Sequence, residues 1–477
     1  MSKHTFLSVV TSLFLLTTST HATTLVVDKT GRGDYTSIQD AINNASDGDV
    51  VEVMPETYYE QINFYGRAIT VTGTNPDDMG TVYGTVINGG TAGVNTVTFD
   101  SGEDRDSILQ GITIENGERG IYCYYSDPLI RKCVIRYAKN NEAAGIQGSS
   151  ASPTIENCEV RENAGYGISW CQGTIENCSI VENSSGGISD CHGLIRDCDI
   201  SFNGSRGLID CDGEINNCSV NQNALYGLSD CNGQIRNCEI TQNRDQGLNY
   251  CRTAEVVNCL VTGNEGNGFY EFSGQIKNCT IVGNQYHGIS MTTSNDYGPA
   301  TIANCIITNN GSYGISNRYP ERCPTTLKFN NIWANGLGNY NGLKPGATDT
   351  HHDPLFAVAG YWDENSWLEG DYHLQSEAGR WTENGWVNDS VTSSCVDAGD
   401  PSGGFYSEPE PNGDRINQGA YGGTELASKS PFGVDPWCTE FLAGDLNDDC
   451  QVDFTDLAVL AADWMKCNLE PASACWQ

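Results

Sequence analysis

The chain has 477 residues and a formal net charge of −36, from 61 acidic and 25 basic residues. This charge excludes a general nucleic-acid-binding protein, because contacts to phosphate need clusters of Lys and Arg. The length allows one large repeat domain and one small additional domain, and the 54 glycines indicate many tight turns.

Residues 1–22 have the pattern of a secretory signal peptide. Lys3 stands in the short polar start, an apolar run extends from Phe6 to Leu16, and small residues lead up to Ala22. This order predicts cleavage after Ala22. The apolar run is too short to cross a bilayer, and no later segment reaches the roughly 20 apolar residues of a membrane helix. We therefore expect a secreted, extracellular protein without a membrane span.

A 20-residue repeat is clear from Pro153 onward. Two series of cysteines keep this period, with one residue inserted before Cys259: Cys158, Cys178, Cys198, Cys218, Cys238, Cys259 and Cys279, and then Cys171, Cys191, Cys211, Cys231 and Cys251. Each cysteine of the first series is followed two positions later by an aliphatic residue, such as Ile180, and nine positions later by a Gly–aliphatic pair, such as Gly187-Ile188. A repeat this short has room for three strands and three bends, but not for a pair of helices. The sequence predicts stacked coils in which equivalent residues lie about 4.8 Å apart.

Asparagine marks two bends of each coil. One column precedes the first-series cysteines, with Asp197 as its exception: Asn157, Asn177, Asn217, Asn237, Asn258 and Asn278. A second column follows those cysteines by five positions: Asn163, Asn183, Asn203, Asn223, Asn243, Asn264 and Asn284. Asn tolerates the left-handed backbone of a sharp bend. Stacked Asn amides can also form hydrogen bonds from coil to coil.

Units such as Ile195-Arg196-Asp197-Cys198-Asp199-Ile200 resemble the right-handed β-helix repeat family of the pectin lyase-like superfamily. The resemblance implies an all-β fold, a right-handed parallel β-helix of three-strand coils over residues 23–335. Residues 33–42 and 47–53 resemble the N-terminal capping helix and first strand of that family. Ile38, Ala41, Ile42 and Ala45 fall on one helical face and are expected to cover the open end of the coils.

The cysteine columns allow two interpretations. Neighbouring coils bring Cα atoms to bonding range, but parallel side chains hold the Cβ atoms farther apart than the roughly 3.8 Å that disulfides favour. We therefore expect buried free thiols that pack as small hydrophobic groups, with disulfides between coils as the alternative. The last four cysteines lie in a short segment with few apolar residues and are expected to form two disulfides: Cys438, Cys450, Cys467 and Cys475.

The repeat breaks near Gly336. Residues 336–430 are rich in Gly, Asn, Asp and aromatic residues, and segments such as Gly370-Asp371-Tyr372-His373-Leu374 resemble the closing coils of extracellular β-helix proteins. We interpret this region as irregular closing coils and loops. Its tryptophans can stack on sugar rings, but we expect them to cap the end of the core: Trp362, Trp367, Trp381 and Trp386.

Residues 431–477 are predicted to form a small α-helical, EF-hand-like module that binds calcium (Ca2+). Oxygen-bearing side chains occupy loop positions 1, 3, 5, 9 and 12, and position 7 can supply a backbone carbonyl: Asp445, Asn447, Asp449, Asp453 and Asp456, with Gln451 at position 7. An apolar stripe of Leu457, Leu460, Ala461 and Trp464 predicts a helix after the loop.

This module resembles a dockerin calcium repeat, the docking part of extracellular polysaccharide-degrading assemblies. The resemblance implies a cohesin-like partner. The chain departs from the dockerin pattern in three ways: Cys450 replaces the usual glycine, Asp456 replaces glutamate, and one repeat is present where two are expected.

The β-helix lyases that the chain resembles generally act along one parallel sheet, where acidic residues hold calcium and a Lys or Arg abstracts a proton. In this chain, Asp190, Asp210 and Asp230 each stand two positions after the aliphatic residue of a Gly–aliphatic pair, on the sheet that corresponds to that of the lyases. Three stacked carboxylates repel one another, so we expect them to bind a cation or to share protons. Our hypothesis is that they bind calcium while Arg206 acts as the base or, more readily, as a clamp on the substrate. The alternative is a solvated acidic edge. Strict alternation from Ile188 would turn Asp190 inward, so the following bend must rotate it outward.

Two functions remain open. The first is a secreted, calcium-dependent polysaccharide lyase or glycoside hydrolase that acts on an acidic plant or algal polysaccharide. Export, the fold resemblance, the Asp column and the dockerin-like module favour it. The second is a non-catalytic carbohydrate-binding or structural solenoid, favoured by the short bends, the few basic residues and the lack of a clear acid–base pair. We expect association with polysaccharide and leave catalysis open.

Overall fold

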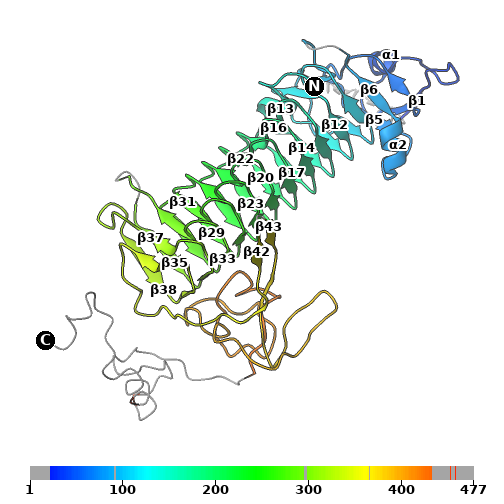
Figure 1. The fold of residues 1–477 in the computed structure, drawn as a ribbon. Helices are drawn as coiled ribbons and strands as arrows, with labels where there is room; N and C mark the ends of the chain where they lie inside the picture. The colour runs from blue at the N-terminus through cyan, green and yellow to red at the C-terminus, as the bar shows by residue number, and fades with distance from the viewer. Residues whose placement is uncertain are drawn as a thin grey trace, which may run out of the picture.

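The computed structural model describes residues 22–90, 93–294, 298–364 and 366–431, together with Val452 and Leu457. The predicted signal peptide up to residue 21 and all the predicted calcium ligands between 445 and 456 lie outside these residues. The described chain winds into a rod of stacked coils, and each coil contributes one strand to each of three parallel sheets (Figure 1).

The sheets contain 14, 13 and 13 strands, and from β2 onward every third strand along the chain joins the same sheet. The first sheet contains β1 (Thr24–Val27), β2 (Val50–Val53), β5 (Thr70–Gly73), β8 (Ile108–Gln110), β11 (Leu129–Arg131), β14 (Thr154–Glu156), β17 (Thr174–Glu176), β20 (Leu194–Arg196), β23 (Glu214–Asn216), β26 (Gln234–Arg236), β29 (Glu255–Val257), β32 (Gln275–Lys277), β35 (Ala300–Ala303) and β38 (Thr325–Lys328). The second contains β3 (Thr57–Tyr58), β6 (Val86–Asn88), β9 (Thr113–Glu115), β12 (Val134–Arg136), β15 (Glu159–Arg161), β18 (Ser179–Val181), β21 (Asp199–Ser201), β24 (Ser219–Asn221), β27 (Glu239–Thr241), β30 (Leu260–Thr262), β33 (Thr280–Val282), β36 (Ile306–Thr308) and β39 (Asn331–Trp333). The third contains β4 (Ile62–Asn63), β7 (Val97–Phe99), β10 (Ile121–Tyr124), β13 (Ala144–Ala151), β16 (Tyr166–Cys171), β19 (Gly186–Ser189), β22 (Arg206–Ile209), β25 (Leu228–Ser229), β28 (Leu248–Asn249), β31 (Phe269–Phe272), β34 (Ile289–Met291), β37 (Tyr313–Ser316) and β40 (Gly338–Asn341).

The core confirms the predicted stacking of equivalent residues. In the second sheet, Ile180 pairs with Ile200, Ile200 with Val220, and Val220 with Ile240, and all four are fully buried. β-Branched side chains suit these positions because they pack well on a pleated surface. Residues that recur with the period of the sequence therefore lie next to one another in one continuous hydrophobic core.

Two short helices lie in the N-terminal coils: α1 (Ile38–Asn44) and α2 (Met79–Gly84). Ser37 caps α1 by accepting a hydrogen bond from the Asp40 N–H, and Ile38, Ala41 and Ile42 are buried in the same core as the coils. The helix lies at the end of the rod near β1 (Figure 1). Its role as the cap of the rod stays a prediction.

Asparagine forms the predicted column inside the bend between the second and third sheets. The side chain of Asn183 donates to Asn203 Oδ1 at 3.1 Å, and that of Asn203 donates to Asn223 Oδ1 at 3.1 Å. The same oxygens also accept the backbone N–H of the preceding Asn, so each buried amide serves two coils. The other predicted column, which includes Asn157, occupies left-handed bends, with φ of 55° at Asn157.

All 17 cysteines within the described residues are free and buried, which confirms the expectation for the two columns. Their thiols donate to backbone carbonyls of the coils, as Cys178 does to the Ile155 oxygen at 3.6 Å. Burial raises the pKa of the Cys123 and Cys211 thiols well above the usual range. Cys123 and Cys211 therefore pack as uncharged groups.

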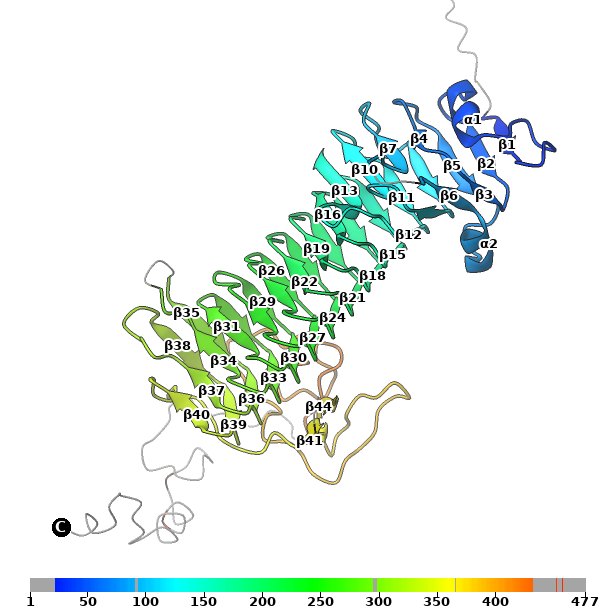
Figure 2. The ribbon, with the colours of Figure 1, turned by 45° about the horizontal axis from the view of Figure 1, so that its top comes forward.

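Beyond β40, the chain returns along the side of the rod. Two small antiparallel pairs, β41 (Phe356–Val358) with β44 (Asp371–Leu374) and β42 (Tyr361–Asp363) with β43 (Ser366–Leu368), begin a region that we call the flank segment, residues 351–364 and 366–431. Figures 1 and 2 both show this yellow-brown and orange region beside the green coils. It packs on the outer face of the second sheet, where Val282 and Ile306 join Phe356 and Trp367 in a second core.

The docking of Trp367 depends on two glycines in the bend after the second sheet. Other members of this bend column, such as Gln242 and Asn309, carry side chains at φ of 54° and 55°, whereas β30 and β33 are followed by Gly263 and Gly283. A Cβ at Gly263 or Gly283 would lie 2.2 or 2.0 Å from the Trp367 ring. The expectation that the tryptophans cap the end of the core is wrong for Trp367, because its indole packs across this flank.

Candidate functional site

The structure places the predicted Asp column at the bend that follows the third sheet. Asp190, Asp210 and Asp230 have φ of 55°, 51° and 54°, so the left-handed backbone turns each of them away from the core. Asp210 is exposed, and Asp190 and Asp230 are partly exposed. Burial of part of its surface, followed by the charges of Asp230 and Asp190, raises the pKa of Asp210. The predicted outward rotation is therefore present, and the charges of the two neighbouring aspartates act on Asp210.

Arg206 begins β22 and does not form an ion pair with the Asp column in the described part of the chain. Its guanidinium lies 5.5 Å from the centre of the Tyr226 ring. Its Nε is buried and has no hydrogen-bond partner among the described residues. Arg206 therefore begins the strand that ends just before Asp210, but no ion pair or hydrogen bond links the two side chains among the described residues.

The Asp column does not form a ready calcium shell. Within the described ranges, no group of three or more His, Cys, Asp or Glu side chains converges closely enough to hold a metal ion. Asp190 and Asp230 instead accept hydrogen bonds from their neighbours Ser189 and Ser229. Calcium needs six to eight oxygen ligands around one point, and a linear column spreads its carboxylates over several coils.

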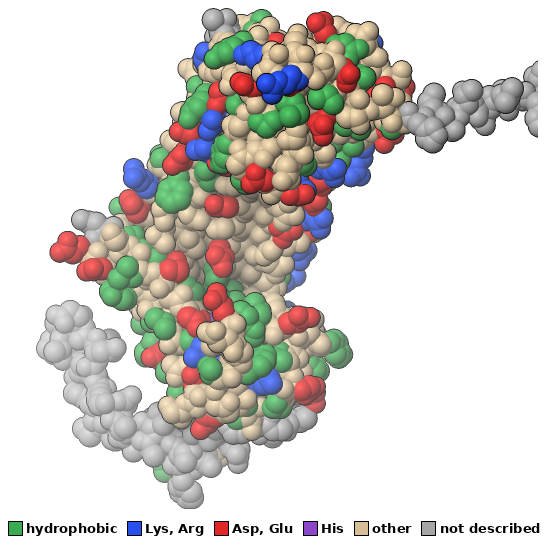
Figure 3. All heavy atoms as spheres, turned by 90° about the vertical axis from the view of Figure 1, so that its right-hand side faces the viewer, with side chains coloured by type: hydrophobic (Ala, Val, Ile, Leu, Met, Phe, Trp, Pro, Cys, Tyr) green, Lys and Arg blue, Asp and Glu red, His purple; other side chains and the backbone are tan. Residues whose placement is uncertain are grey.

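The surface charge of the rod is dispersed. On the face shown in Figure 3, acidic side chains stand singly along broad uncharged surface, and basic side chains lie mainly near the edges. Many basic residues are already neutralised by acidic neighbours, as Arg136 is by Glu115 and Arg196 by Glu176. This face does not offer the continuous basic track that a polyanion would need.

A different site lies between the coils and the flank segment, and we call it the flank groove. It consists of two adjoining cavities that share Gln222 and Gln242. The first, of about 310 Å³, is also lined by Phe202, Arg244, Gly263, Glu265, Trp362, Ser366 and Trp367. The second, of about 270 Å³, is also lined by Ser219, Asn221, Glu239, Thr241, Leu260, Glu369, Gly370, Tyr372 and Tyr421. One wall therefore comes from β24, β27, β30 and the bends that follow the second sheet, and the other wall comes from the flank segment.

Left-handed bends turn the side chains of the bend column into this groove. Phe202, Gln222 and Gln242 have φ of 57°, 52° and 54° in three successive coils. The Phe202 ring is 55% exposed, so a large apolar surface faces solvent beside two amides. On the opposite wall, Trp362 lines the groove and donates its ring N–H to the Gly283 oxygen at 2.6 Å.

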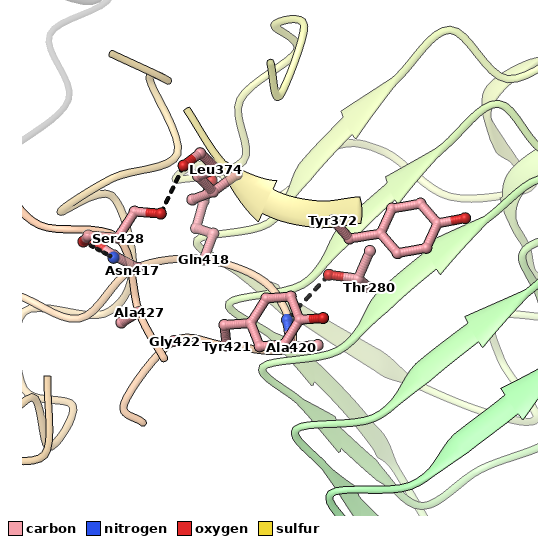
Figure 4. Close-up of a pocket in the computed structure, with 10 residues that line it drawn as sticks. All are labelled: Thr280, Tyr372, Leu374, Asn417, Gln418, Ala420, Tyr421, Gly422, Ala427 and Ser428. Atoms are coloured by element: carbon pink, nitrogen blue, oxygen red, sulfur yellow. Dashed lines mark hydrogen bonds between the residues drawn. The ribbon is translucent and has the colours of Figure 1, made fainter. Parts of the chain in front are cut away.

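Hydrogen bonds fix the flank segment on the second sheet. The Ala420 N–H donates to Thr280 Oγ1 at 3.0 Å, and Asn258 donates to the oxygens of Ala420 and Gly422 at 2.8 Å each. Figure 4 shows the side chains of Tyr372 and Tyr421 near Thr280, where the flank segment meets the second sheet. The far wall of the groove is thus held by backbone as well as side-chain contacts.

Two carboxyl groups from opposite walls share the second cavity. Glu239 is the first residue of β27, and Glu369 follows β43. Glu369 accepts hydrogen bonds from Thr262 at 2.9 and 3.0 Å, from the Trp367 ring N–H at 3.1 Å, and from the Tyr372 hydroxyl. Loss of water around Glu239, together with the charge of Glu369, raises the pKa of Glu239.

The sequence analysis did not identify Glu239 and Glu369. Glu239 occupies an outward column whose neighbours are Ser219 and Leu260, so its own repeat gives no sign of a special role. Glu369 lies in the region without a repeat. Their proximity arises only from the docking of the flank segment.

Comparisons with known families cover two parts of the chain, each less than half of it. Residues 59–190 match the family described as "Right handed beta helix region", and residues 215–399 match the family described as "Disaggregatase related". The second match includes both Glu239 and Glu369. No curated protein matches the chain. No helix among the described residues is long and apolar enough to cross a membrane.

Several solved structures are similar to the chain at low identity. The A-module of the mannuronan C-5 epimerase AlgE4 from Azotobacter vinelandii is 15% identical, with a TM-score of 0.42 over 67% of this chain and 96% of that one. The pectate lyase Pel9A is 14% identical, with a TM-score of 0.33 over 84% and 96%. A variant of the PL6-family alginate lyase AlyGC is 12% identical, with a TM-score of 0.43 over 81% and 59%. The family match to residues 59–190 and the three parallel sheets together show that the coils form a right-handed parallel β-helix.

Proposed function

We propose that the protein binds an extended polysaccharide in the flank groove. The observation that carries this proposal is the union of two cavities through Gln222 and Gln242, with the exposed Phe202 ring on one wall and Trp362 on the other. Aromatic rings pack against the apolar faces of sugars, and amides can both donate to and accept from sugar hydroxyls. A long groove suits a polymer better than a small molecule, because it contacts several sugar units at once.

The charges of the groove favour a neutral polysaccharide over the acidic one expected from the sequence. Glu239, Glu265 and Glu369 line it, against the single basic residue Arg244. A polymer of uronic acids would bring further negative charge to a chain whose net charge is already −36. Uncharged sugars avoid this repulsion, and their hydroxyls can donate to the carboxylates.

We predict that neutral polysaccharides bind the full chain and that Phe202→Ala weakens this binding about tenfold, which corresponds to the loss of about 1.4 kcal/mol. The cause is the loss of the exposed aromatic surface of Phe202. The measurement is affinity electrophoresis against a panel of neutral and acidic polysaccharides, followed by calorimetry with the best ligand. Tyr59→Ala is the matched control, because Tyr59 is an exposed aromatic residue of the N-terminal coils and lies outside the groove. Equal affinities of wild type and Phe202→Ala would refute binding in this groove.

Calcium binding is a separate proposal with two locations, the Asp190, Asp210 and Asp230 column and the predicted loop that begins at Asp445. The repulsion that the charges of Asp230 and Asp190 exert on Asp210 favours the first, since a bound cation would relieve it. We expect calorimetric titration of the full chain with Ca2+ to show one tight event that Asp445→Asn removes. Asp210→Asn is expected to remove only a weaker event. A titration unchanged by Asp210→Asn would show that the column binds no calcium. A titration unchanged by Asp445→Asn would show the same for the loop.

Secretion and a cohesin-like partner complete the proposal. The pattern of residues 1–22 supports export, and the loop between Asp445 and Asp456 supports docking into a larger extracellular assembly. A chain that stays inside cells when expressed with residues 1–22 would contradict export. Failure of the full chain to bind immobilised cohesin domains in the presence of Ca2+ would contradict docking.

A further inference from the structure

We propose that Glu239 and Glu369 hydrolyse a glycosidic bond of the polysaccharide held in the flank groove, with Glu239 as the general acid and Glu369 as the general base. This inference rests on the proposed function, because it needs a sugar chain in the groove. It goes beyond binding by assigning a reaction and two catalytic residues.

The two carboxyl groups occupy the same cavity but have different surroundings. Both line the second cavity of the flank groove, one from each wall. Within the described ranges, the Glu239 carboxyl has no hydrogen-bond or ion-pair partner. The Glu369 carboxylate, in contrast, accepts hydrogen bonds from Thr262, Trp367 and Tyr372. Pairs of carboxyl groups with such unequal surroundings are the usual source of separate acid and base roles.

The surroundings of Glu239 suit an acid. Desolvation by the walls of the groove and the nearby negative charge of Glu369 both disfavour its ionised form. Glu239 nevertheless remains accessible to solvent, so a sugar oxygen can approach it. A raised pKa lets a carboxylic acid hold its proton to a higher pH than usual and pass it to a leaving group.

Hydrogen bonds hold the Glu369 carboxyl in place on the far wall of the groove. Three side chains donate to it: those of Thr262, Trp367 and Tyr372. They also fix its orientation, since Trp367 is itself packed against Gly263 and Gly283. A fixed negative charge can stabilise the positive charge that develops at the anomeric carbon, and it can accept a proton from an attacking water.

The reaction consumes one water for each bond cleaved. Glu239 transfers its proton to the glycosidic oxygen while the bond from that oxygen to the anomeric carbon breaks, and the released sugar leaves as an alcohol. The oxygen of a water molecule bonds to the anomeric carbon, and Glu369 takes the proton that this water loses. The proton on Glu369 returns to solvent and Glu239 takes one up, so both groups regain their starting states.

The test measures binding and hydrolysis separately on the full chain. The substrate is the neutral polysaccharide that binds most tightly in the panel, and the readout is the release of reducing ends. We expect Glu239→Gln and Glu369→Gln each to lower the rate by about 100-fold or more, while calorimetry shows binding within a few-fold of wild type. Glu214→Gln is the control, because Glu214 is an exposed glutamate of β23 outside the groove and is expected to leave the rate unchanged.

The pH profile separates a catalytic role from a structural one. The raised pKa of Glu239 predicts that wild-type activity persists to a higher pH than an ordinary glutamic acid would allow and then falls as Glu239 loses its proton. The Glu239→Gln variant should lack this fall. Binding without any release of reducing ends, or release that both variants retain, would overturn the catalytic assignment and leave the binding proposal standing. Absence of binding by the wild-type chain would instead overturn the proposed function. Products that absorb as unsaturated sugars would show elimination and would also refute hydrolysis.

Discussion

Replacing Asn223 with Ala should lower the free energy of unfolding by about 3 kcal/mol, because the change leaves several buried polar groups without partners. Asn223 Oδ1 accepts from both the backbone and the side chain of Asn203, at 3.1 Å each. Its own side chain donates to the Ile200 oxygen and to Asn243 Oδ1, at 3.0 Å each. Alanine cannot replace any of these bonds, and the site is too enclosed for water to do so, since Asn223 is fully buried.

The measurement is denaturant unfolding followed by circular dichroism, with Asn216→Ala as the control. Asn216 belongs to the same coil but is partly exposed on the outer face of β23, where water can replace its hydrogen bonds. Because each coil contacts only its neighbours, the loss should also loosen the coils around Asn203 and Asn243 more than distant ones. Hydrogen exchange that is accelerated evenly along the rod would argue against this local view. A loss equal to that of Asn216→Ala would contradict the importance of the buried column.

Replacing Gly283 with Asn should detach the flank segment from the coils and abolish binding in the flank groove. A Cβ at Gly283 would lie 2.0 Å from the Trp367 ring, which is far too close for the rigid indole to accommodate. Asn is chosen because Asn309 occupies the next position of the same bend column at φ of 55°, so the backbone shape itself tolerates this residue. The expected effect therefore comes from the clash with Trp367 and not from backbone strain.

We expect proteolysis between Phe356 and Leu374 to accelerate at least tenfold in Gly283→Asn, while the circular dichroism of the coils remains unchanged. A double-mutant cycle with Trp367→Ala provides the internal control. Once the indole is absent, Asn at 283 meets no obstacle, so it should add little to the effect of Trp367→Ala alone. Full polysaccharide binding by Gly283→Asn would show that the flank segment is not a wall of the binding site.

The right-handed β-helix could be predicted from the sequence because its period appears directly in the chain. Ile180, Ile200, Val220 and Ile240 recur at one spacing, and parallel pairing turns that spacing into a stacked core. The buried thiols and the Asn column follow from the same register. The predicted outward turn at Asp190 is also present, because a left-handed residue follows the strand there, as it does at Asp210 and Asp230.

The candidate site could not be predicted in this way. Glu239 lies in the repeat region, but the equivalent residues of the adjacent coils, Ser219 and Leu260, do not mark its position as special. Glu369 lies outside the repeat region. The sequence analysis did not single out Gly263 and Gly283, which make room for Trp367 in the structure. Only the return of the flank segment along the second sheet explains why Val282 and Ile306 are apolar on an outward face.

The sequence by itself therefore determined the rod, its three sheets and the columns of equivalent side chains, since contacts between adjacent coils repeat with the period of the chain. Only the tertiary structure decided where the flank segment docks and which carboxyl groups share a groove. The physical reason is that this docking depends on shape and burial between segments about a hundred residues apart, and such contacts leave no periodic trace along the chain.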